Sequence, residues 1–225
     1  MSGLSAIQKN IQVLTQRLQT LTETPPEIVI ASKYASIDQI RAVVKAGILN
    51  LGENKLQDAI LKQQQLNDDR VKWHFIGHLQ RNKVRKVLAH FDCIQSVDRI
   101  ELAEKINEVS AELGRQMSVL LQVNIAKDPA KHGFDPELIK DQLTQIFQFQ
   151  NLNIEGIMVI IPLLDTHEAQ LQYFAKARDL FDVIRQDYPE MSVLSMGMSQ
   201  DFEAAVAAGS TMIRIGRSIF KESIL

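Results

Sequence analysis

The chain has 225 residues, of which 45% are hydrophobic, and carries 25 basic against 27 acidic side chains. This balance argues against a nucleic-acid-binding or membrane-surface protein, and the apolar content suffices for a sizeable core. The single cysteine, Cys93, excludes an internal disulfide and a thiolate metal cage. Since no apolar leader opens the chain and its apolar runs are too short to span a bilayer, we expect a cytoplasmic protein.

The first predicted element is a helix within residues 1–23. Its apolar residues, Ile7, Ile11, Leu14, Leu18 and Leu21, recur at the period of about 3.6 that is typical of an amphipathic helix. Two prolines follow this segment and cannot continue it.

Eight short apolar runs follow and alternate with amphipathic segments. They are residues 28–31, 48–52, 71–76, 92–96, 118–125, 154–160, 192–197 and 211–216. This alternation predicts parallel βαβ units, and eight of them predict a (β/α)8 barrel, with an open doubly wound sheet as the alternative. No linker rich in Pro, Gly or Ser interrupts the chain. We therefore expect one domain over 1–225, with the polar run 62–70 as a solvated helix end and loop.

The strand predicted at 28–31 ends just before Lys33. The C-terminal ends of barrel strands carry the functional groups, so Lys33 is expected at the rim of the active face. Its apolar and small neighbours could desolvate the amine and leave it as a nucleophile that forms Schiff bases with carbonyl compounds. Alternatively, the side chain only extends into solvent from a strand end.

The stretch SMGMSQDFEAAVAAGSTMIRIG, residues 195–216, contains two glycine turns. The loops after the last two strands of such barrels frequently bind phosphate through backbone N–H groups and a helix N-terminus. Gly197 and Gly216 would let the backbone approach an anion, Ser199 is a natural N-cap, and the hydroxyl of Ser199 or Thr211 could add a donor. The same residues are also ordinary turn formers.

Polar residues also follow the second and third predicted strands. Asn54 could contact a ligand or cap a helix, and His74 is expected to face the interior as a core histidine rather than to act in catalysis. His78 comes four residues later, on a turn and with no third ligand near in sequence, so no zinc site is expected. The loop 124–134 is either a lid or a solvated loop.

Together these stretches resemble the pyridoxal phosphate (PLP) homeostasis proteins, which are similar to a free-standing alanine racemase barrel domain. The resemblance covers nearly the whole chain and is most detailed toward cyanobacterial members. It is carried by IVIASKYASI, LGENKLQD, WHFIGHLQRNK, GIMVIIPL and SMGMSQDFEAAVAAGSTMIRIGRSIF. It implies the PLP fold type III, a TIM barrel like the N-terminal domain of alanine racemase, here with an extra N-terminal helix. The loop NIAKDPAKHGF departs from the serine-glycine-glutamate turn of many relatives.

The resemblance also implies PLP as the cofactor and assigns roles to residues. Lys33 would carry PLP as a Schiff base, and Arg214 would face the pyridine nitrogen, whose protonation a neighbouring cation disfavours. The implied cofactor-binding residues are Lys33, Asn54, His74, Met198, Ser199, Arg214, Gly216 and Arg217. It implies no catalytic residue and no metal ligand.

Racemases of this barrel type take a second base, a tyrosine, from a C-terminal domain of a partner subunit, and this chain stops at Leu225. Tyr34, Tyr173 and Tyr188 offer no evident substitute, and Tyr34 alternates to the face opposite to Lys33 if the strand continues. The resemblance therefore implies a monomer that binds PLP without turnover. Its role would be in PLP homeostasis and amino- and keto-acid balance, with PLP-dependent apo-enzymes as partners. The alternatives are a weak PLP-dependent racemase or lyase, and a cofactor-free Schiff-base aldolase.

Overall fold

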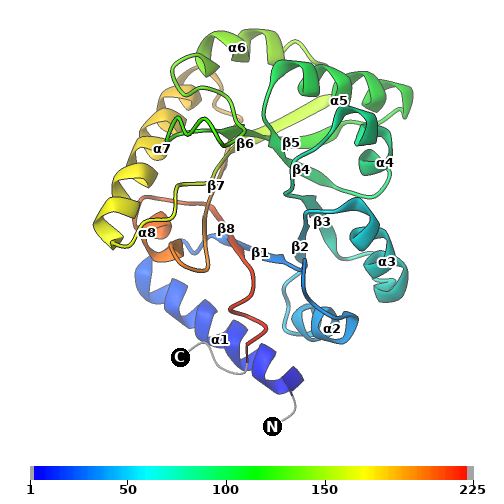
Figure 1. The fold of residues 1–225 in the computed structure, drawn as a ribbon, viewed down its shortest axis with the longest axis vertical. Helices are drawn as coiled ribbons and strands as arrows, with labels where there is room; N and C mark the ends of the chain where they lie inside the picture. The colour runs from blue at the N-terminus through cyan, green and yellow to red at the C-terminus, as the bar shows by residue number, and fades with distance from the viewer. Residues whose placement is uncertain (1–2, 222–225) are drawn as a thin grey trace.

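The computed structural model describes residues 3–221, in which parallel strands close into a barrel with helices around it (Figure 1). The strands are β1 (Glu27–Ala31), β2 (Asn50–Glu53), β3 (Lys72–Phe75), β4 (Cys93–Val97), β5 (Met117–Val123), β6 (Leu152–Val159), β7 (Val193–Met198) and β8 (Met212–Ile215). Each strand pairs with the next one along the chain, and β8 pairs with β1. The predicted barrel is confirmed, and the open sheet is wrong.

The helices occupy the predicted connections and precede the barrel at its N-terminus. They are α1 (Gly3–Leu21), α2 (Ile37–Lys45), α3 (Leu56–Leu66), the 3₁₀ helix η1 (Arg81–Lys83), α4 (Val84–Leu88), α5 (Ile100–Glu112), α6 (Ile139–Ile146), α7 (His167–Asp187) and α8 (Phe202–Ala207). Local sequence explains where α2 begins, because Ser36 and Gln39 form a capping box that satisfies two N-terminal N–H groups.

The predicted N-terminal helix is present as α1 and packs against α2 and α8. Its apolar stripe, Ile7, Ile11, Leu14 and Leu18, is buried, at about 1.5–3 kcal/mol per side chain fully removed from water. Helix α1 therefore covers α2, which follows β1, and α8, which precedes β8. Asn10 on the same helix donates from Nδ2 to the carbonyl oxygens of Ile219 (3.0 Å) and Lys221 (2.9 Å), and so fixes the segment that follows β8.

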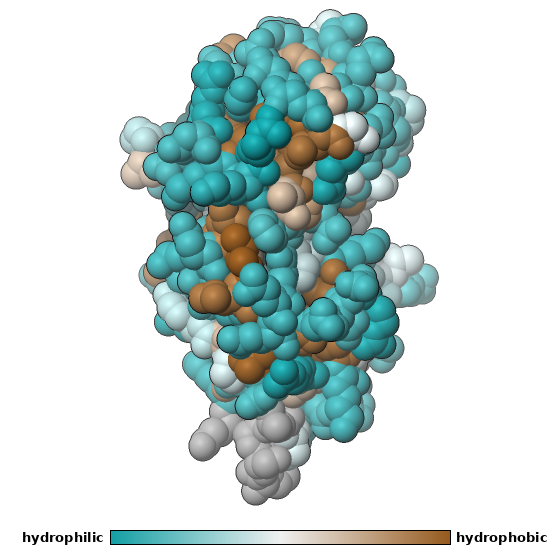
Figure 2. Space-filling view, turned by 90° about the vertical axis from the view of Figure 1, so that its right-hand side faces the viewer, coloured by the Kyte–Doolittle hydropathy of each residue, from teal (hydrophilic) through white to brown (hydrophobic). Residues whose placement is uncertain are grey.

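The main core lies between the barrel strands and the helices that surround them. Figure 2 shows the side that carries α2 to α5: hydrophilic side chains dominate this surface, and apolar ones gather in the seams between them. Two strands of the barrel approach closely at Gly156 on β6, where an added Cβ would lie 1.7 Å from the carbonyl oxygen of Val193. No helix within residues 3–221 has the length and apolarity to cross a membrane.

Candidate functional site

Four neighbouring strands bring most of the predicted site residues to one arc of the barrel rim. Lys33 follows β1 and Asn54 follows β2, whereas Ser199 follows β7 and Gly216 follows β8. Because β7, β8, β1 and β2 are consecutive in the closed sheet and all parallel, their C-terminal ends lie side by side. The structure therefore brings together residues that lie more than 160 positions apart in the sequence.

The turn that carries Lys33 is held by a buried ion pair beneath it. Glu53, whose side chain is 0% exposed, accepts a hydrogen bond from the Ser32 hydroxyl (2.8 Å) and pairs with the ammonium group of Lys62. Nζ of Lys62 also donates to the carbonyl oxygen of Ser32 (2.7 Å), which accepts the backbone N–H of Ala35 as well (2.8 Å). These contacts fix the backbone on either side of Lys33.

Sequence reasoning missed this support. It placed Lys62 in a solvated polar run, 62–70, but Lys62 lies in α3 and its side chain is only 14% exposed. A carboxylate at the end of an apolar strand, nine residues before a lysine on the following helix, was the available signal. A buried charge needs a partner, so Glu53 at the end of a buried strand implies a cation nearby.

Lys33 itself is exposed, which agrees with the alternative of a side chain that extends into solvent, and its apolar neighbours do not bury the amine. Its Nζ lies 4.7 Å from the centroid of the Tyr34 ring. Tyr34 would have alternated to the opposite face had the strand continued, but β1 ends at Ala31 and the chain turns there. A hydrogen bond with Lys33 and the positive charge of its amine lower the pKa of the Tyr34 phenol.

The turns after β7 and β8 meet through hydroxyl groups. Oγ of Ser199 accepts the backbone N–H of Gly216 (3.2 Å) and lies 3.0 Å from Oγ of Ser218. An added Cβ at Gly216 would meet only Ala31, at 3.8 Å, so the space above this backbone is open. Within residues 3–221 the backbone N–H of Arg217 has no backbone acceptor. Neutral hydroxyls and N–H groups around an open space suit an anion such as a phosphate.

Two details of this turn differ from the prediction. Helix α8 begins after Asp201, and Ser199 is not its N-cap; the carboxylate of Asp201 instead accepts the backbone N–H of Met198 (2.5 Å). Burial raises the pKa of Asp201. Thr211 lies at the opposite end of the barrel, just before β8, where its hydroxyl accepts the N–H of Leu194 (2.8 Å). It is therefore too far from the C-terminal rim to act as a phosphate donor.

Arg214 lies inside the barrel on β8, with its guanidinium held by backbone and hydroxyl oxygens. Nη1 donates to the carbonyl oxygen (2.9 Å) and the hydroxyl (2.6 Å) of Ser195, and Nη2 donates to the carbonyl oxygen of Val159 (2.9 Å). Burial lowers the pKa of Arg214 to about 10, so the group stays cationic at neutral pH. Three of its five N–H groups are thus engaged, which leaves the N–H of Nε and one N–H of Nη2 for a further acceptor.

His74 is connected to Arg214 through two side chains. The hydroxyl of Ser195 donates to Oε1 of Gln95 (2.8 Å), and Nε2 of Gln95 lies 3.1 Å from Nδ1 of His74. Since Gln95 donates there, Nδ1 accepts and the ring proton belongs on Nε2, which faces Oδ1 of Asn50 at 3.3 Å. Burial lowers the pKa of His74 to about 4. The histidine is therefore neutral, buried and hydrogen-bonded, as expected of a core histidine.

The remaining predicted residues lie at the rim. Asn54 is exposed next to Gly77, and the N-cap of α3 is Lys55, so Asn54 does not cap that helix. Met198 ends β7 and is exposed, as is Arg217 after β8. The ligand contacts of these residues, like those of Lys33, His74, Ser199, Arg214 and Gly216, remain predictions.

Comparison with known proteins gives consistent results. Residues 3–223 match the family model described as alanine racemase, N-terminal domain. A pyridoxal phosphate homeostasis protein of Vibrio alginolyticus is 35% identical over 96% of this chain and 97% of its own. That of Synechocystis is 37% identical over 92% of this chain and 96% of its own.

Solved structures agree with these relatives. PipY of Synechococcus elongatus PCC7942 has 38% identity and a TM-score of 0.89 without PLP and 0.87 with PLP bound, with 96% of this chain and 100% of that chain covered. An alanine racemase of Clostridium difficile 630, at 15% identity and a TM-score of 0.77, shares the barrel fold over 94% of this chain and 56% of its own. The chain thus belongs to the pyridoxal phosphate homeostasis protein family and has the alanine racemase N-terminal barrel.

Proposed function

We propose that this protein binds PLP on Lys33 and acts in intracellular PLP homeostasis and amino- and keto-acid balance, without catalytic turnover. The observation that supports this most is the meeting of Lys33 with the hydroxyl-lined turn of Ser199 and Gly216 on one arc of the rim, with Arg214 beneath. The names of the relatives and the PLP bound in the PipY structure point to the same ligand.

The residues present fit this cofactor. The open backbone at Gly216 and the hydroxyls of Ser199 and Ser218 suit its phosphate, because they are neutral groups that can donate hydrogen bonds to an anion. The exposed amine of Lys33 is accessible to its aldehyde. PLP supplies a carbonyl that condenses reversibly with amines and a ring that withdraws electrons from the product.

Arg214 limits the chemistry that this site can support. It is cationic at neutral pH, and a pyridine nitrogen that accepted one of its free N–H groups would not be protonated there, since two positive charges would then adjoin. An unprotonated ring withdraws electrons weakly. The chain therefore holds the cofactor in a form that suits storage or delivery more than chemistry at an amino-acid Cα. We propose PLP-dependent apo-enzymes as recipients, and a monomer as the carrier.

The test is the absorption spectrum of the purified protein before and after borohydride. We expect a visible band that borohydride abolishes and that is missing in Lys33→Ala, because Lys33 follows β1, the strand that pairs with β8 ahead of the Gly216 turn. Lys55→Ala is the matched control, since Lys55 is also exposed and lies near Tyr34. If Lys33→Ala kept a reducible lysine adduct, the assignment of Lys33 would be wrong.

The phosphate site has its own test. Ser199→Ala should weaken the binding of PLP several-fold and leave that of pyridoxal, which lacks the phosphate, unchanged. Equal loss for both ligands would place the phosphate elsewhere.

The carrier role is tested by measuring the rate at which PLP reaches an apo-enzyme. If the PLP-loaded protein activates the apo-enzyme no faster than free PLP at the same concentration, the carrier role is contradicted.

One observation favours a second candidate, a weak PLP-dependent racemase or lyase. Tyr34, with its lowered pKa, lies beside Lys33 and could act as a base there. Incubation of the PLP-loaded protein with D- and L-amino acids in deuterated water distinguishes the two. Deuterium entering Cα at a turnover rate, and lost in Tyr34→Phe, would favour the enzyme over the carrier.

A further inference from the structure

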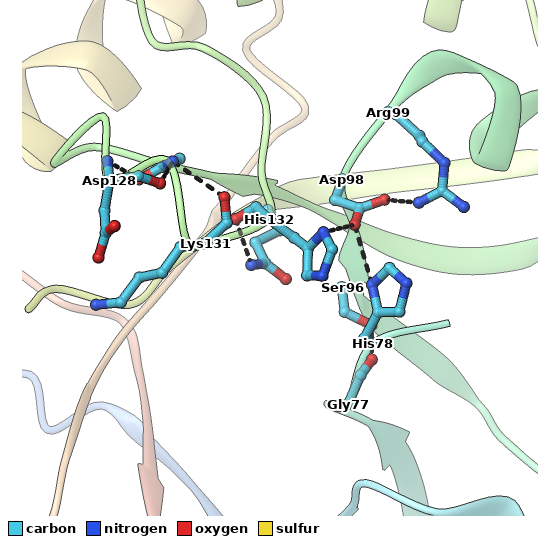
Figure 3. Close-up of polar contacts among 10 residues, drawn as sticks. Gly77, His78, Ser96, Asp98, Arg99, Asp128, Lys131 and His132 are labelled. Atoms are coloured by element: carbon cyan, nitrogen blue, oxygen red, sulfur yellow. Dashed lines mark hydrogen bonds and ion pairs between the residues drawn. The ribbon is translucent and has the colours of Figure 1, made fainter. Parts of the chain in front are cut away.

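A second group of ligand-type side chains lies on the opposite arc of the same rim (Figure 3). His78 follows β3, Asp98 follows β4, and His132 lies in the loop after β5. Oδ2 of Asp98 is 3.3 Å from Nδ1 of His78 and 3.7 Å from Nδ1 of His132. All three ligand atoms lie within 4.8 Å of one another. This cluster is separate from Lys33 and the phosphate turn.

We propose that His78, Asp98 and His132 bind a divalent transition-metal ion, with zinc as the best match. Zinc holds imidazole nitrogen and carboxylate oxygen at about 2.0–2.2 Å, so ligand atoms around one ion lie roughly 3.3–3.5 Å apart. The two distances to Asp98 are close to that spacing. Two imidazoles with one carboxylate form a set that leaves a coordination position for water, and imidazole favours zinc over magnesium or calcium.

The carboxylate of Asp98 is set up to bind through one oxygen. Its side chain is 3% exposed, and Oδ1 is engaged by the guanidinium of Arg99, which leaves Oδ2 for the two histidines. Carboxylate ligands of metals are commonly oriented by such outer hydrogen bonds. The positive charge of Arg99 lowers affinity for a cation, but the Arg99 side chain is partly exposed, so water screens it.

Both loops that carry the histidines are held by side-chain contacts to the backbone. Oγ of Ser96 donates to the carbonyl oxygen of Gly77, directly before His78 (2.5 Å). After β5, Nδ2 of Asn124 donates to the carbonyl oxygens of Asp128 (2.8 Å) and Lys131 (3.2 Å). Figure 3 shows the two imidazoles converging on Asp98 from these separate loops. The positions of both histidines are thus fixed by the fold.

The rings themselves are stacked, with centroids 3.9 Å apart and planes 19° apart. A metal ion lies in the plane of each ring that binds it, so at least one imidazole must rotate about the Cβ–Cγ bond when the ion enters. Their side chains are 41% and 62% exposed, which leaves room for that rotation. The expectation of no zinc site considered His74 and His78, which are near in sequence. In the cluster, His78 is joined instead by Asp98 and His132 from two later loops.

The test uses the full chain, stripped with a chelator and dialysed, and titrated with Zn²⁺ by calorimetry and with Co²⁺ by visible absorption. We expect one ion per chain. His78→Ala, His132→Ala and Asp98→Asn should each weaken zinc binding by about tenfold or more. His167→Ala, which removes an exposed histidine on α7, should not change it. Lys33→Ala should also bind zinc normally, since this site does not depend on PLP.

Two outcomes would overturn the proposal. The wild-type protein could show no saturable zinc binding, or the three variants could bind as the wild type does. In either case the cluster is a hydrogen-bonded group around Asp98 only. Circular dichroism of each variant without metal, together with His78→Gln and His132→Gln, separates loss of a ligand from loss of folding.

Discussion

The two arcs of the barrel rim present opposite chemistry on one scaffold. The arc of β7, β8, β1 and β2 offers neutral donors at Ser199 and Gly216 beside the amine of Lys33, and so suits an anion with a carbonyl group. The arc of β3, β4 and β5 offers two imidazoles around the carboxylate of Asp98, and so suits a cation. Each arc is fixed by a different kind of support, and this difference can be tested.

Beneath the rim, a hydrogen-bonded chain inside the barrel joins the two arcs. It runs from Arg214 on β8 through Ser195 and Gln95 to His74 on β3. Every donor in it points the same way, from the cation toward the neutral histidine. The arcs therefore differ in their ligands but share one interior, and changes in the interior should reach the PLP arc through Arg214.

The largest effect is expected where the PLP arc rests on a buried charge. Lys62→Met leaves the carboxylate of Glu53, which is 0% exposed, without its partner. Removing one member of a buried ion pair costs about 3–5 kcal/mol, so we expect a loss of that size in the free energy of unfolding. Urea denaturation measures it. The turn of Lys33 should loosen as well, and PLP retention should fall.

Two variants control this prediction. Lys55→Met, at an exposed lysine at the start of the same helix, should change stability by less than about 0.5 kcal/mol. The pair Glu53→Gln with Lys62→Met should recover much of the loss, because no uncompensated charge remains. Equal stability of Lys62→Met and the wild type would show that Glu53 needs no cation.

The next effect concerns the turn after β7. Gly197 has φ +94°, and an added Cβ would lie 2.6 Å from Cβ of Ala205. Strain and crowding together should make Gly197→Ala cost about 2–4 kcal/mol. Gly114→Ala, at φ +63° with no atom within 4 Å of the new Cβ, isolates the backbone strain at about 1 kcal/mol. Urea denaturation compares the two.

Gly197→Ala also tests whether the two arcs bind their ligands independently. Gly197→Ala should reduce PLP binding several-fold, because it displaces the turn of Ser199, and should leave zinc binding at His78, Asp98 and His132 unchanged. A parallel loss of both ligands would mean that the two arcs are not independent.

Much of the fold could be predicted because each element carries its own signal. Eight apolar runs separated by amphipathic segments leave few alternatives to a barrel, and Lys33, Gly197 and Ser199 stand at the ends of such runs. The details of the local turns could not be predicted from the sequence. Tyr34 lies beside Lys33 because the chain turns directly after β1, and Asp201 rather than Ser199 precedes α8. Propensity does not decide which of several polar residues at a turn becomes the cap.

The interior and the second arc could not be predicted for a different reason. Gln95, Ser195 and His74 meet only because β3, β4 and β7 close into one barrel, and no spacing along the chain encodes that contact. His132 reaches Asp98 from another loop, 34 residues later in the sequence. Such contacts follow from the topology and register of the whole sheet rather than from any segment of it.

The smallest effect tests whether the interior chain couples to the PLP arc. The buried, neutral His74 has a pKa of about 4 in the folded protein, against about 6.5 when unfolded. Between these values the unfolded chain binds more protons, so stability falls as pH drops from about 6.5 to about 4. The contribution of this one group is about 1.4 kcal/mol per pH unit within that window, or roughly 2 kcal/mol between pH 7 and pH 5.

His74→Gln should remove this slope in urea denaturation measured across that pH range, and His167→Gln, at an exposed histidine, should keep it. Protonated His74 would turn a donor toward Nε2 of Gln95, so the contact that now holds the chain would become repulsive. Ser195 and then Arg214 would lose their orientation, and PLP retention should decline over the same pH range in the wild type but not in His74→Gln. Parallel stability curves for the two proteins would mean that His74 is hydrated in the fold and carries no such coupling.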